Sequence, residues 1–410
     1  MRVVLHIGTE KTATTTLQDF VYANREVLRQ KGVVLSDVLG KTNNRKLAAF
    51  CVPEKNFDDY FKDRRIRTVE AKRAHFQGFR DSFISEARQL SRTAHTLLIT
   101  SEHFHSRLRD TASIERLKAV LDEISDDVTV LCYFREQSAV VYSLYSTAIK
   151  SGNVLDLTAY AARCVPKNDY FNYFRFFGKW RDVFGRERLR ARLYAKNAFV
   201  GGDIRQDLLS QLLPEPDMAD FDCTAPAANR SLGLVGLELG RLTNSAFGRY
   251  NADGTMNPVR QRLLDLIMHS DLGRLGRLPF PQAVEIHKRF ARSNRRFAVE
   301  YLDLRRNPFP RPGSGEDHDA ANAPLSPTAL AQLVDFWGEL LEMIHRGDLG
   351  GDTRAAQLAW SAATALRTSG SMSSDRMRLP PLKVDPSAER LSFARRIRAA
   401  IAAARLVWRS

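Results

Sequence analysis

Cysteine is scarce in this sequence, and long apolar runs are missing from it. The four cysteines, at positions 51, 132, 164 and 223, lie far apart and form no C-x-x-C pair, which argues against a disulfide framework and against a zinc site. No apolar stretch approaches the ~20 residues of a membrane-spanning helix, and the apolar run at the N-terminus is too short for a signal peptide. We therefore expect a cytoplasmic protein, and the sequence offers no evident metal cluster.

Apolar residues and positive charge, by contrast, are plentiful. The 410 residues are 44% apolar and carry a net charge of +15, so a sizeable core is available. A basic chain suits polyanionic partners such as phosphorylated nucleotides, acidic glycans, nucleic acid or an anionic membrane. Nearly half of this charge follows residue 350, where 11 Lys and Arg stand against 4 Asp and Glu. Because that charge lies outside the predicted core, we expect no specific nucleic-acid partner.

Short apolar runs alternate with helical patterns through the first half of the chain. This alternation predicts an α/β fold of three layers, α/β/α, with a central parallel sheet and a helical C-terminal part. Strands are predicted at 3–7, 33–36, 96–100, 128–134 and 189–194. Helices are predicted at 14–31, 66–90, 113–124, from 135 onward, 170–184, 203–213, 231–247, 258–270, 281–302 and 326–346. The alternating arginines of 189–194 indicate an edge strand.

The composition also predicts how the chain is divided. Residues 1–350 are expected to form one domain, with helical insertions at about 37–95 and 250–280. Ser and Pro then mark a linker at 351–387, and 388–410 forms a basic amphipathic helix. The apolar stripe of this helix either packs on the main domain, or the segment 388–409 contacts a partner or an anionic membrane. The second alternative would bring the protein to the inner face of the membrane.

The N-terminal stretch carries the clearest chemical signal. An apolar run is followed by Gly8-Thr9-Glu10-Lys11-Thr12-Ala13 and then by three threonines that begin a helix. A strand, a tight loop and a helix N-terminus together form a cradle for an anion. The stretch does not match the phosphate loop G-x-x-x-x-G-K-[ST]. The alternative is a buried strand that leads into a helix capped by Thr14.

Two further strands are also predicted to end in polar side chains. Ser101, Glu102 and His103 follow the third strand, and Arg135 follows the fourth. Because ligands of parallel α/β sheets bind beyond the carboxyl ends of the strands, we expect these groups to meet the N-terminal loop at one edge. Ser143 lies eight residues after Arg135, so the two can share a helix face.

These motifs resemble those of a known family. The stretch from His6 to Gln18 resembles the 5′-phosphosulfate loop of sulfotransferases that use 3′-phosphoadenylyl sulfate (PAPS), whose usual form is K-x-G-T-T-x-L-Q. The segment from Tyr133 through Arg135 to Ser143-Leu144-Tyr145 resembles their 3′-phosphate motif. Ser101-Glu102 resembles the strand-end S-E of the bacterial and glycan branch. The resemblance covers roughly residues 1 to 300 and implies a P-loop NTPase-like sulfotransferase fold.

The resemblance also implies a role for each matching residue. Lys11 would contact the bridging oxygen between phosphate and sulfate. The 5′-phosphate would be held by the loop and helix start, namely Thr12, Ala13, Thr14, Thr15 and Thr16. Arg135 and Ser143 would hold the 3′-phosphate, and Tyr194 would lie near adenine. Alanine at 13, where the family has glycine, is the main departure, since a positive φ there would strain it.

Sulfuryl transfer also needs a base for the acceptor hydroxyl. Glu102 and His103 compete for that role, and the resemblance favours Glu102. His6 and His105 are interpreted as structural residues. The acceptor is expected to be a hydroxyl on a carbohydrate or glycolipid, and PAPS is the co-substrate. Two alternatives remain open: a nucleotide-dependent phosphotransferase, and a protein that binds nucleotides or nucleic acid without transferase activity.

Overall fold

The computed structural model describes residues 1–224, 232–269 and 276–313. The predicted helix at 326–346, the linker at 351–387 and the basic helix at 388–410 lie outside these ranges. The described residues divide into two compact units. The first comprises Met1–Val141, Ala162–Asn229 and Phe280–Gly313, and the second contains Tyr142–Ala161 and Arg230–Pro279. Of the residues predicted to bind PAPS or to act as the base, all except Ser143 belong to the first unit.

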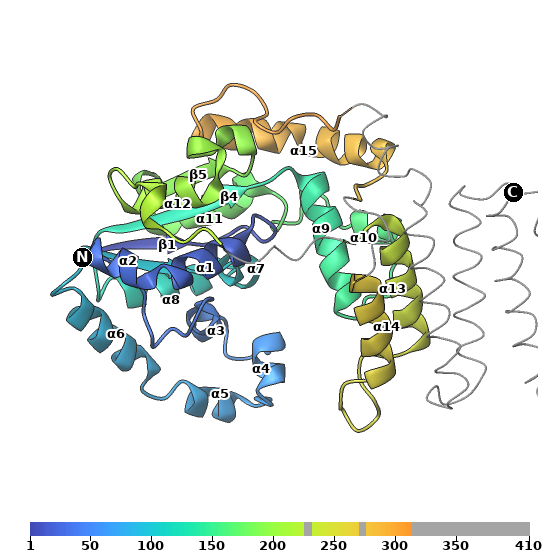
Figure 1. Ribbon diagram of the computed structural model, residues 1–410, viewed down its shortest axis with the longest axis horizontal. Helices are drawn as coiled ribbons and strands as arrows, with labels where there is room; N and C mark the ends of the chain where they lie inside the picture. Colours follow the sequence, from blue (N-terminus) through green and yellow to red (C-terminus); the bar gives the residue numbers. More distant parts are fainter. Residues whose placement is uncertain (225–231, 270–275, 314–410) are drawn as a thin grey trace, which may run out of the picture. The chain divides into compact units, whose positions relative to one another are not determined.

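A five-stranded parallel sheet forms the centre of the first unit (Figure 1). The strands are β1 (Arg2–His6), β2 (Val33–Val34), β3 (Thr96–Thr100), β4 (Val128–Phe134) and β5 (Leu189–Leu193), in the order β2-β3-β1-β4-β5. All four pairings are parallel, which confirms the predicted sheet, and β5 is the edge strand that its arginines predicted. Because β1 lies between β3 and β4, the loops that follow these three strands are neighbours.

Helices cover both faces of the sheet. Alternate side chains of each strand point to opposite faces, so they pack in two different cores. Val3 and Leu5 of β1 join the core that contains α8 (Thr111–Leu121), α11 (Tyr173–Phe184) and α15 (Phe280–Tyr301). Val4 joins the opposite core, with α1 (Thr14–Ala23), α2 (Arg25–Gln30) and α12 (Ile204–Leu212). This arrangement confirms the three-layer α/β/α class. Within the aromatic run at 170–184, the residues from Tyr173 to Phe184 form the core helix α11.

Two predicted helices are each divided in the structure. The helix predicted at 14–31 is α1 and α2, separated at Asn24, whose side-chain amide donates to the carbonyl oxygens of Phe20 and Asp222 at 2.9 Å. The helix predicted at 66–90 is α5 (Val69–His75) and α6 (Phe79–Leu90), with Gly78 at φ 69° between them. The prediction of continuous helices was wrong, because the Asn24 side chain bonds to the distant carbonyl of Asp222 at the first break and Gly78 adopts a left-handed conformation at the second.

The chain between β2 and β3 also contains α3 (Arg45–Cys51) and α4 (Asp59–Asp63). A short helix that was not predicted, α7 (His103–Arg107), follows β3. The helix expected after Arg135 is α9 (Gln137–Lys150), which runs from the first unit into the second.

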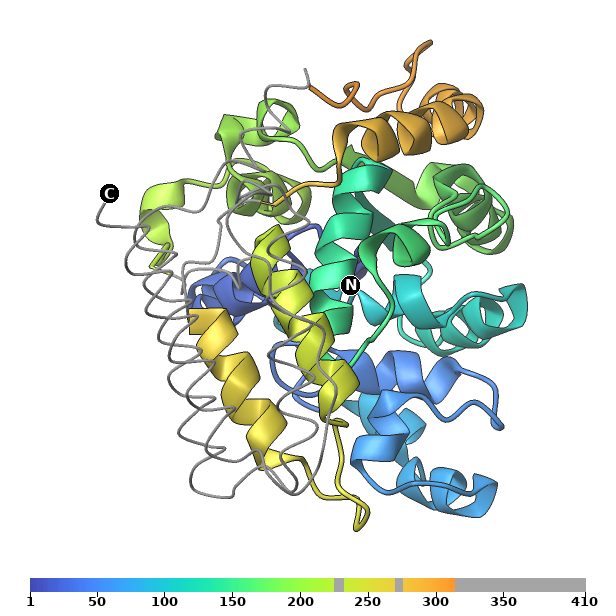
Figure 2. The same ribbon diagram turned by 90° about the vertical axis from the view of Figure 1, so that its right-hand side faces the viewer.

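The second unit is helical in its described parts. It holds α10 (Leu157–Ala161), α13 (Leu234–Ala246) and α14 (Pro258–His269), of which α13 and α14 run side by side (Figure 2). Buried Arg260 joins them, since its guanidinium donates to Asn244 Oδ1 at 2.8 Å and to the Lys150 carbonyl oxygen at 2.9 Å. Within 1–224, 232–269 and 276–313, none of the helices combines the length and the apolar character needed to cross a membrane.

Candidate active site

The loop after β1 is held against the end of β4 by backbone bonds. The Thr9 N–H donates to the carbonyl oxygen of Tyr133 at 2.9 Å, and the Tyr133 N–H donates to the Gly8 carbonyl at 2.7 Å. Inside the loop, the Thr12 hydroxyl donates to the Thr9 carbonyl at 2.6 Å. Lys11 is therefore presented from a short, partly buried and internally bonded loop at the carboxyl edge of the sheet.

The N-terminus of α1 has no side-chain cap. Ala13 occupies the N-cap position at φ 57° and ψ 29°, and no side chain there accepts a bond from the helix. The first bond of the helix runs from the Leu17 N–H to the Ala13 carbonyl, so the N–H groups of residues 14–16 precede the helical ladder. The alternative in which Thr14 caps the helix is wrong. What results is an open helix N-terminus that favours an anion.

Ala13 adopts the positive φ that is unfavourable for an alanine. Its φ of 57° lies in the left-handed region, which costs an alanine about 1 kcal/mol relative to glycine. Lys11 also has a positive φ, of 69°. The loop thus places two residues with a Cβ in a strained region, and its neighbours on β4 hold it there.

Arg135 and Tyr194 lie beside this loop. The Arg135 Nη1 donates to the carbonyl oxygen of Lys11 at 3.1 Å, and the guanidinium carbon lies 5.4 Å from the centre of the Tyr194 ring. The Tyr173 hydroxyl donates to the Arg135 carbonyl at 2.6 Å, which fixes the backbone at the end of β4. Ser143 lies in α9 in the second unit, so its partnership with Arg135 stays a prediction.

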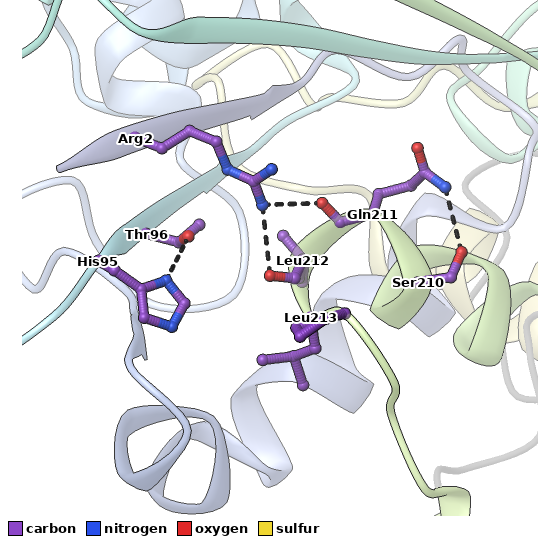
Figure 3. Close-up of a pocket in the computed structure, with 8 residues that line it drawn as sticks. Arg2, His95, Thr96, Ser210, Gln211, Leu212 and Leu213 are labelled. Atoms are coloured by element: carbon purple, nitrogen blue, oxygen red, sulfur yellow. Dashed lines mark hydrogen bonds between the residues drawn. The ribbon is translucent and has the colours of Figure 1, made fainter.

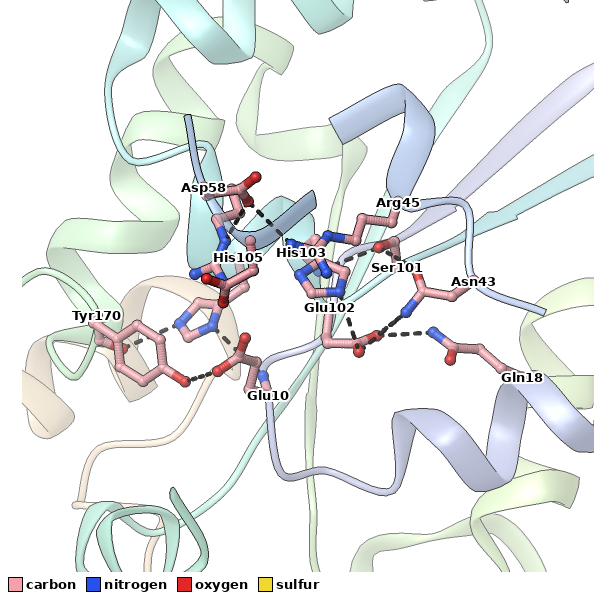
Figure 4. A network of polar contacts seen from close by, with 12 residues as sticks. Glu10, Gln18, Asn43, Arg45, Asp58, Ser101, Glu102, His103, His105 and Tyr170 are labelled. Atoms are coloured by element: carbon pink, nitrogen blue, oxygen red, sulfur yellow. Dashed lines mark hydrogen bonds and ion pairs between the residues drawn. The ribbon is translucent and has the colours of Figure 1, made fainter. Parts of the chain in front are cut away.

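Glu102 lies at the centre of a network of amides (Figure 4). Its carboxylate accepts from Gln18 Nε2 at 2.9 Å and from Asn43 Nδ2 at 3.0 and 3.1 Å. The Ser101 hydroxyl donates to Asn43 Oδ1 at 2.6 Å, which turns the amide nitrogen of Asn43 toward Glu102. The carboxylate is therefore held by α1 on one side and by the loop before α3 on the other.

His103 is the other predicted base, and it lies beside Glu102. The His103 Nε2 is 3.8 Å from Glu102 Oε1, and the backbone N–H of His103 donates to the Ser101 hydroxyl at 3.2 Å. Burial lowers the pKa of His103, against the opposing effect of the Glu102 charge. A neutral imidazole can accept a proton, so His103 keeps the chemistry that a base requires.

The other two histidines near these strands are packed in the interior. The His6 Nδ1 lies 2.9 Å from the Thr100 hydroxyl, and burial lowers the pKa of His6 to about 4. His105 is equally buried, and burial lowers its pKa to about 4 as well. Both interpretations of these histidines as structural residues agree with this burial.

The segment before α5 is anchored next to Glu102 and His103. The Asn44 side-chain oxygen accepts from the Thr100 N–H at 2.8 Å, and the Asn44 N–H donates to the Thr100 carbonyl at 3.0 Å. Asp58 forms ion pairs with Arg107 at 2.8 Å and Arg45 at 3.3 Å. Burial acts to raise the pKa of Asp58, but the two arginines outweigh it and the pKa is lowered. The segment is thus fixed to the end of β3.

Sequence reasoning missed several of these contacts. Asn43 lies in a polar stretch without any motif, so no local signal marked it. Gln18 was part of the N-terminal motif, but its partner, 84 residues away, could not be inferred from spacing. Glu10 was also passed over, although it bonds to Tyr170 at 2.5 Å.

A pocket of about 420 Å³ lies at the opposite end of the strands (Figure 3). Arg2 opens β1 there and donates to the carbonyl oxygens of Gln211 at 2.9 Å and Leu212 at 3.3 Å. His95 lies 2.9 Å from the Thr96 hydroxyl and 3.0 Å from the Lys31 carbonyl. These polar groups hold the fold together, so the pocket is not the candidate site. No group of three or more potential metal ligands occurs among the described residues.

Comparison with known proteins adds little to this geometry. No family model matches the chain, and no curated protein matches it. A solved structure of a sulfotransferase from Alicyclobacillus acidocaldarius is similar, with a TM-score of 0.29 and 15% sequence identity. The match covers 47% of this chain and 73% of that one. Similarity at this level does not indicate a function.

Proposed function

We propose that the protein transfers a sulfuryl group from PAPS to a hydroxyl of a carbohydrate or glycolipid. The observation that carries the proposal is the bond between Arg135 and the carbonyl of Lys11, beside an uncapped helix N-terminus. Two motifs separated by 124 residues meet at this point. Together they offer amide groups and two cations, which suits a ligand with phosphate at both its 5′ and 3′ ends.

The residues present fit such a donor. The open N–H groups of residues 14–16 suit the 5′-phosphate, because amides and the helix dipole both favour negative charge. The planar fork of Arg135 suits a second phosphate. Tyr194, whose ring lies beside that guanidinium, offers an aromatic face for adenine. Ser143 is proposed as a further ligand of the 3′-phosphate.

The proposed reaction moves one sulfuryl group. The acceptor oxygen attacks sulfur, the bond from sulfur to the bridging phosphate oxygen breaks, and adenosine 3′,5′-bisphosphate leaves. Lys11 stabilises the negative charge that develops on this bisphosphate. Glu102 takes the proton of the acceptor hydroxyl, and His103 beside it is the other proposed base. Like phosphoryl transfer, the step depends on positioning and electrostatics, and this scheme assigns no role to a metal ion.

The amides around Glu102 support the proposed acceptor class. Asn43 and its neighbours before α3 supply polar groups next to the base, which suits a substrate with several hydroxyls. The S-E resemblance to the glycan branch supports the same class. The identity of the sugar and the position of its hydroxyl are outside this proposal.

Calorimetric titration with adenosine 3′,5′-bisphosphate, in the absence of Mg²⁺, tests the donor site. We expect saturable binding to the full chain and much weaker binding of adenosine 5′-monophosphate, which has no 3′-phosphate. Transfer of ³⁵S from labelled PAPS to a panel of oligosaccharides and glycolipids tests the reaction. Lys11→Met is expected to abolish transfer while leaving the far-UV circular dichroism spectrum unchanged.

The outcomes separate the alternatives. No detectable binding of the bisphosphate would sink the proposal. Binding of ATP that requires Mg²⁺ would favour a phosphotransferase. Bisphosphate binding without transfer to any acceptor would favour a protein that only binds nucleotides, and a fully active Lys11→Met variant would remove Lys11 from the mechanism.

A further inference from the structure

Glu10, the residue before Lys11, is bonded to a distant segment. Its carboxylate accepts a hydrogen bond from the Tyr170 hydroxyl at 2.5 Å. In Figure 4 the Glu10 side chain points toward Tyr170, away from Glu102. Burial acts to raise the pKa of Glu10, but the bond from Tyr170 and the charges nearby outweigh it and lower the pKa. The side chain is therefore a carboxylate that has its own donor inside the protein.

His105 contacts both Glu10 and Tyr170, so the three residues form a closed ring of contacts. The Glu10 N–H points at His105 Nδ1 at 3.5 Å, and His105 Nε2 lies 3.1 Å from the Tyr170 carbonyl oxygen. A carbonyl can only accept, so the partners assign the proton to Nε2 and leave Nδ1 as the acceptor. This is the neutral tautomer, as expected for a fully buried imidazole. The His105 and Tyr170 rings are also in contact, with centroids 4.4 Å apart.

The ring of contacts restrains the backbone on the N-terminal side of Lys11. Arg135 restrains the C-terminal side through the Lys11 carbonyl, and Thr12 bonds back to Thr9. Between these restraints Lys11 holds a φ of 69°, which is unfavourable for a residue with a Cβ. A strained conformation persists only where its surroundings determine it, so we expect the contacts of Glu10 to hold the Lys11 backbone in this conformation.

We propose that Glu10, Tyr170 and His105 are positioning residues, which hold the loop so that Lys11 faces the group that leaves in the transfer. The inference rests on the proposed function. Tyr170 also keeps the Glu10 carboxylate occupied. Without this hydrogen bond the carboxylate would be released next to Lys11, where it would compete for the lysine with the negative charge that develops on the leaving group. Displacing a reacting group by about 1 Å can lower a rate 100-fold.

Tyr170→Phe in the full-length chain removes only the hydroxyl and is the main test, with Glu10→Gln as a second variant. The first measurement is amide hydrogen exchange of the peptide that covers residues 8–13. The second is kcat and KM for PAPS, and the third is the affinity for adenosine 3′,5′-bisphosphate. Tyr301→Phe is the matched control, because it likewise removes one tyrosine hydroxyl, from the end of α15.

We expect tenfold faster exchange in residues 8–13 and a 10- to 100-fold lower kcat for both variants. KM and the bisphosphate affinity should change less than threefold, because the amides of α1 and Arg135 remain. The double variant should be no slower than either single variant, since both remove the same contact. The control should match the wild type in all three measurements.

Three results would overturn the inference: unchanged exchange in the loop, faster exchange without a fall in kcat, or a loss that lies entirely in KM. If the wild-type chain neither binds the bisphosphate nor transfers sulfate, the proposed function fails by itself. The exchange measurement then still decides whether Glu10 and Tyr170 hold the loop.

Discussion

The guanidinium of Arg135 donates to the backbone oxygen of Lys11 at 3.1 Å. The two residues come from the ends of adjacent strands, β4 and β1, which pair in parallel from Val3 to His6. One cation therefore supports the backbone that presents the other. A substitution at Arg135 can weaken ligand binding directly or by disturbing the Lys11 loop. Two ligands, one with and one without a 3′-phosphate, distinguish these effects.

Arg135→Ala should weaken the binding of adenosine 3′,5′-bisphosphate by about 10- to 100-fold, since a charge-assisted bond contributes about 1.5–3 kcal/mol. Binding of adenosine 5′-monophosphate should change less than threefold, because it has no 3′-phosphate. Calorimetric titration measures both affinities, and Arg92→Ala, an exposed site, is the control. An equal loss for both nucleotides would show that Arg135 acts through the Lys11 loop.

Ala13→Gly should stabilise the protein by about 0.5 kcal/mol. Glycine adopts the observed φ of 57° without a Cβ clash, and this gain exceeds the extra freedom of glycine in the unfolded chain. Urea denaturation measures the change. Ala291→Gly, in the exposed face of α15, is the matched control and should destabilise by about 1 kcal/mol. The same sign for both variants would contradict the role of the positive φ.

Glu102→Gln should lower kcat by 100-fold or more, the usual contribution of a positioned base. The amide keeps the shape of the carboxylate and one acceptor for Gln18 and Asn43, so the bisphosphate affinity should stay within threefold. His103→Gln should lower kcat less than tenfold. Initial rates at saturating PAPS and acceptor compare the two variants. The reverse order of effects would assign the base to His103.

Asn43→Asp should move the acidic limb of the pH–rate profile to higher pH. The new carboxylate would lie where the Asn43 amide now contacts Glu102 at 3.0 Å, and two like charges at this distance cannot both ionise readily. The profile of kcat/KM between pH 5 and 9 measures the shift. Asn43→Ala is the control, since it removes the amide without adding charge. A profile that coincides with that of Asn43→Ala would contradict this electrostatic account.

The pH dependence of stability should reflect the buried histidines. Burial lowers the pKa of His6 to about 4, so the unfolded chain, with an ordinary pKa near 6.5, binds the proton more tightly. The contribution of His6 to the free energy of unfolding is therefore fully present above pH 6.5. It falls as the pH drops toward 4, by about 1.4 kcal/mol per pH unit for such a group.

His6→Gln should remove one such contribution and flatten the fall between pH 6.5 and pH 5. Urea denaturation at both pH values measures the difference between the variant and the wild type. His269→Gln, at an exposed position, should leave the wild-type slope unchanged. A slope in His6→Gln as steep as in the wild type would show that the proton does not bind at His6.

Much of the architecture could be predicted because it depends on short-range patterns. The apolar runs that became β1, β3 and β4 are buried, and buried parallel strands need continuous apolar residues. The arginines at 190 and 192 marked β5 as an edge. The helix predicted at 14–31 failed at Asn24, because its side chain bonds to the carbonyl of Asp222, nearly 200 residues away. No local pattern contains that contact.

The sequence by itself determined the strand–loop–helix at residues 3–18, the polar residues at the strand ends and the parallel class of the sheet. Only the tertiary structure decided that β1 lies between β3 and β4, which brings Lys11, Glu102 and Arg135 to one edge. It alone revealed the positive φ of Ala13 and the contact between Glu10 and Tyr170. The reason is physical. Local propensity depends on neighbours in the chain, whereas these features depend on the order of strands and on bonds between residues 124 to 160 positions apart.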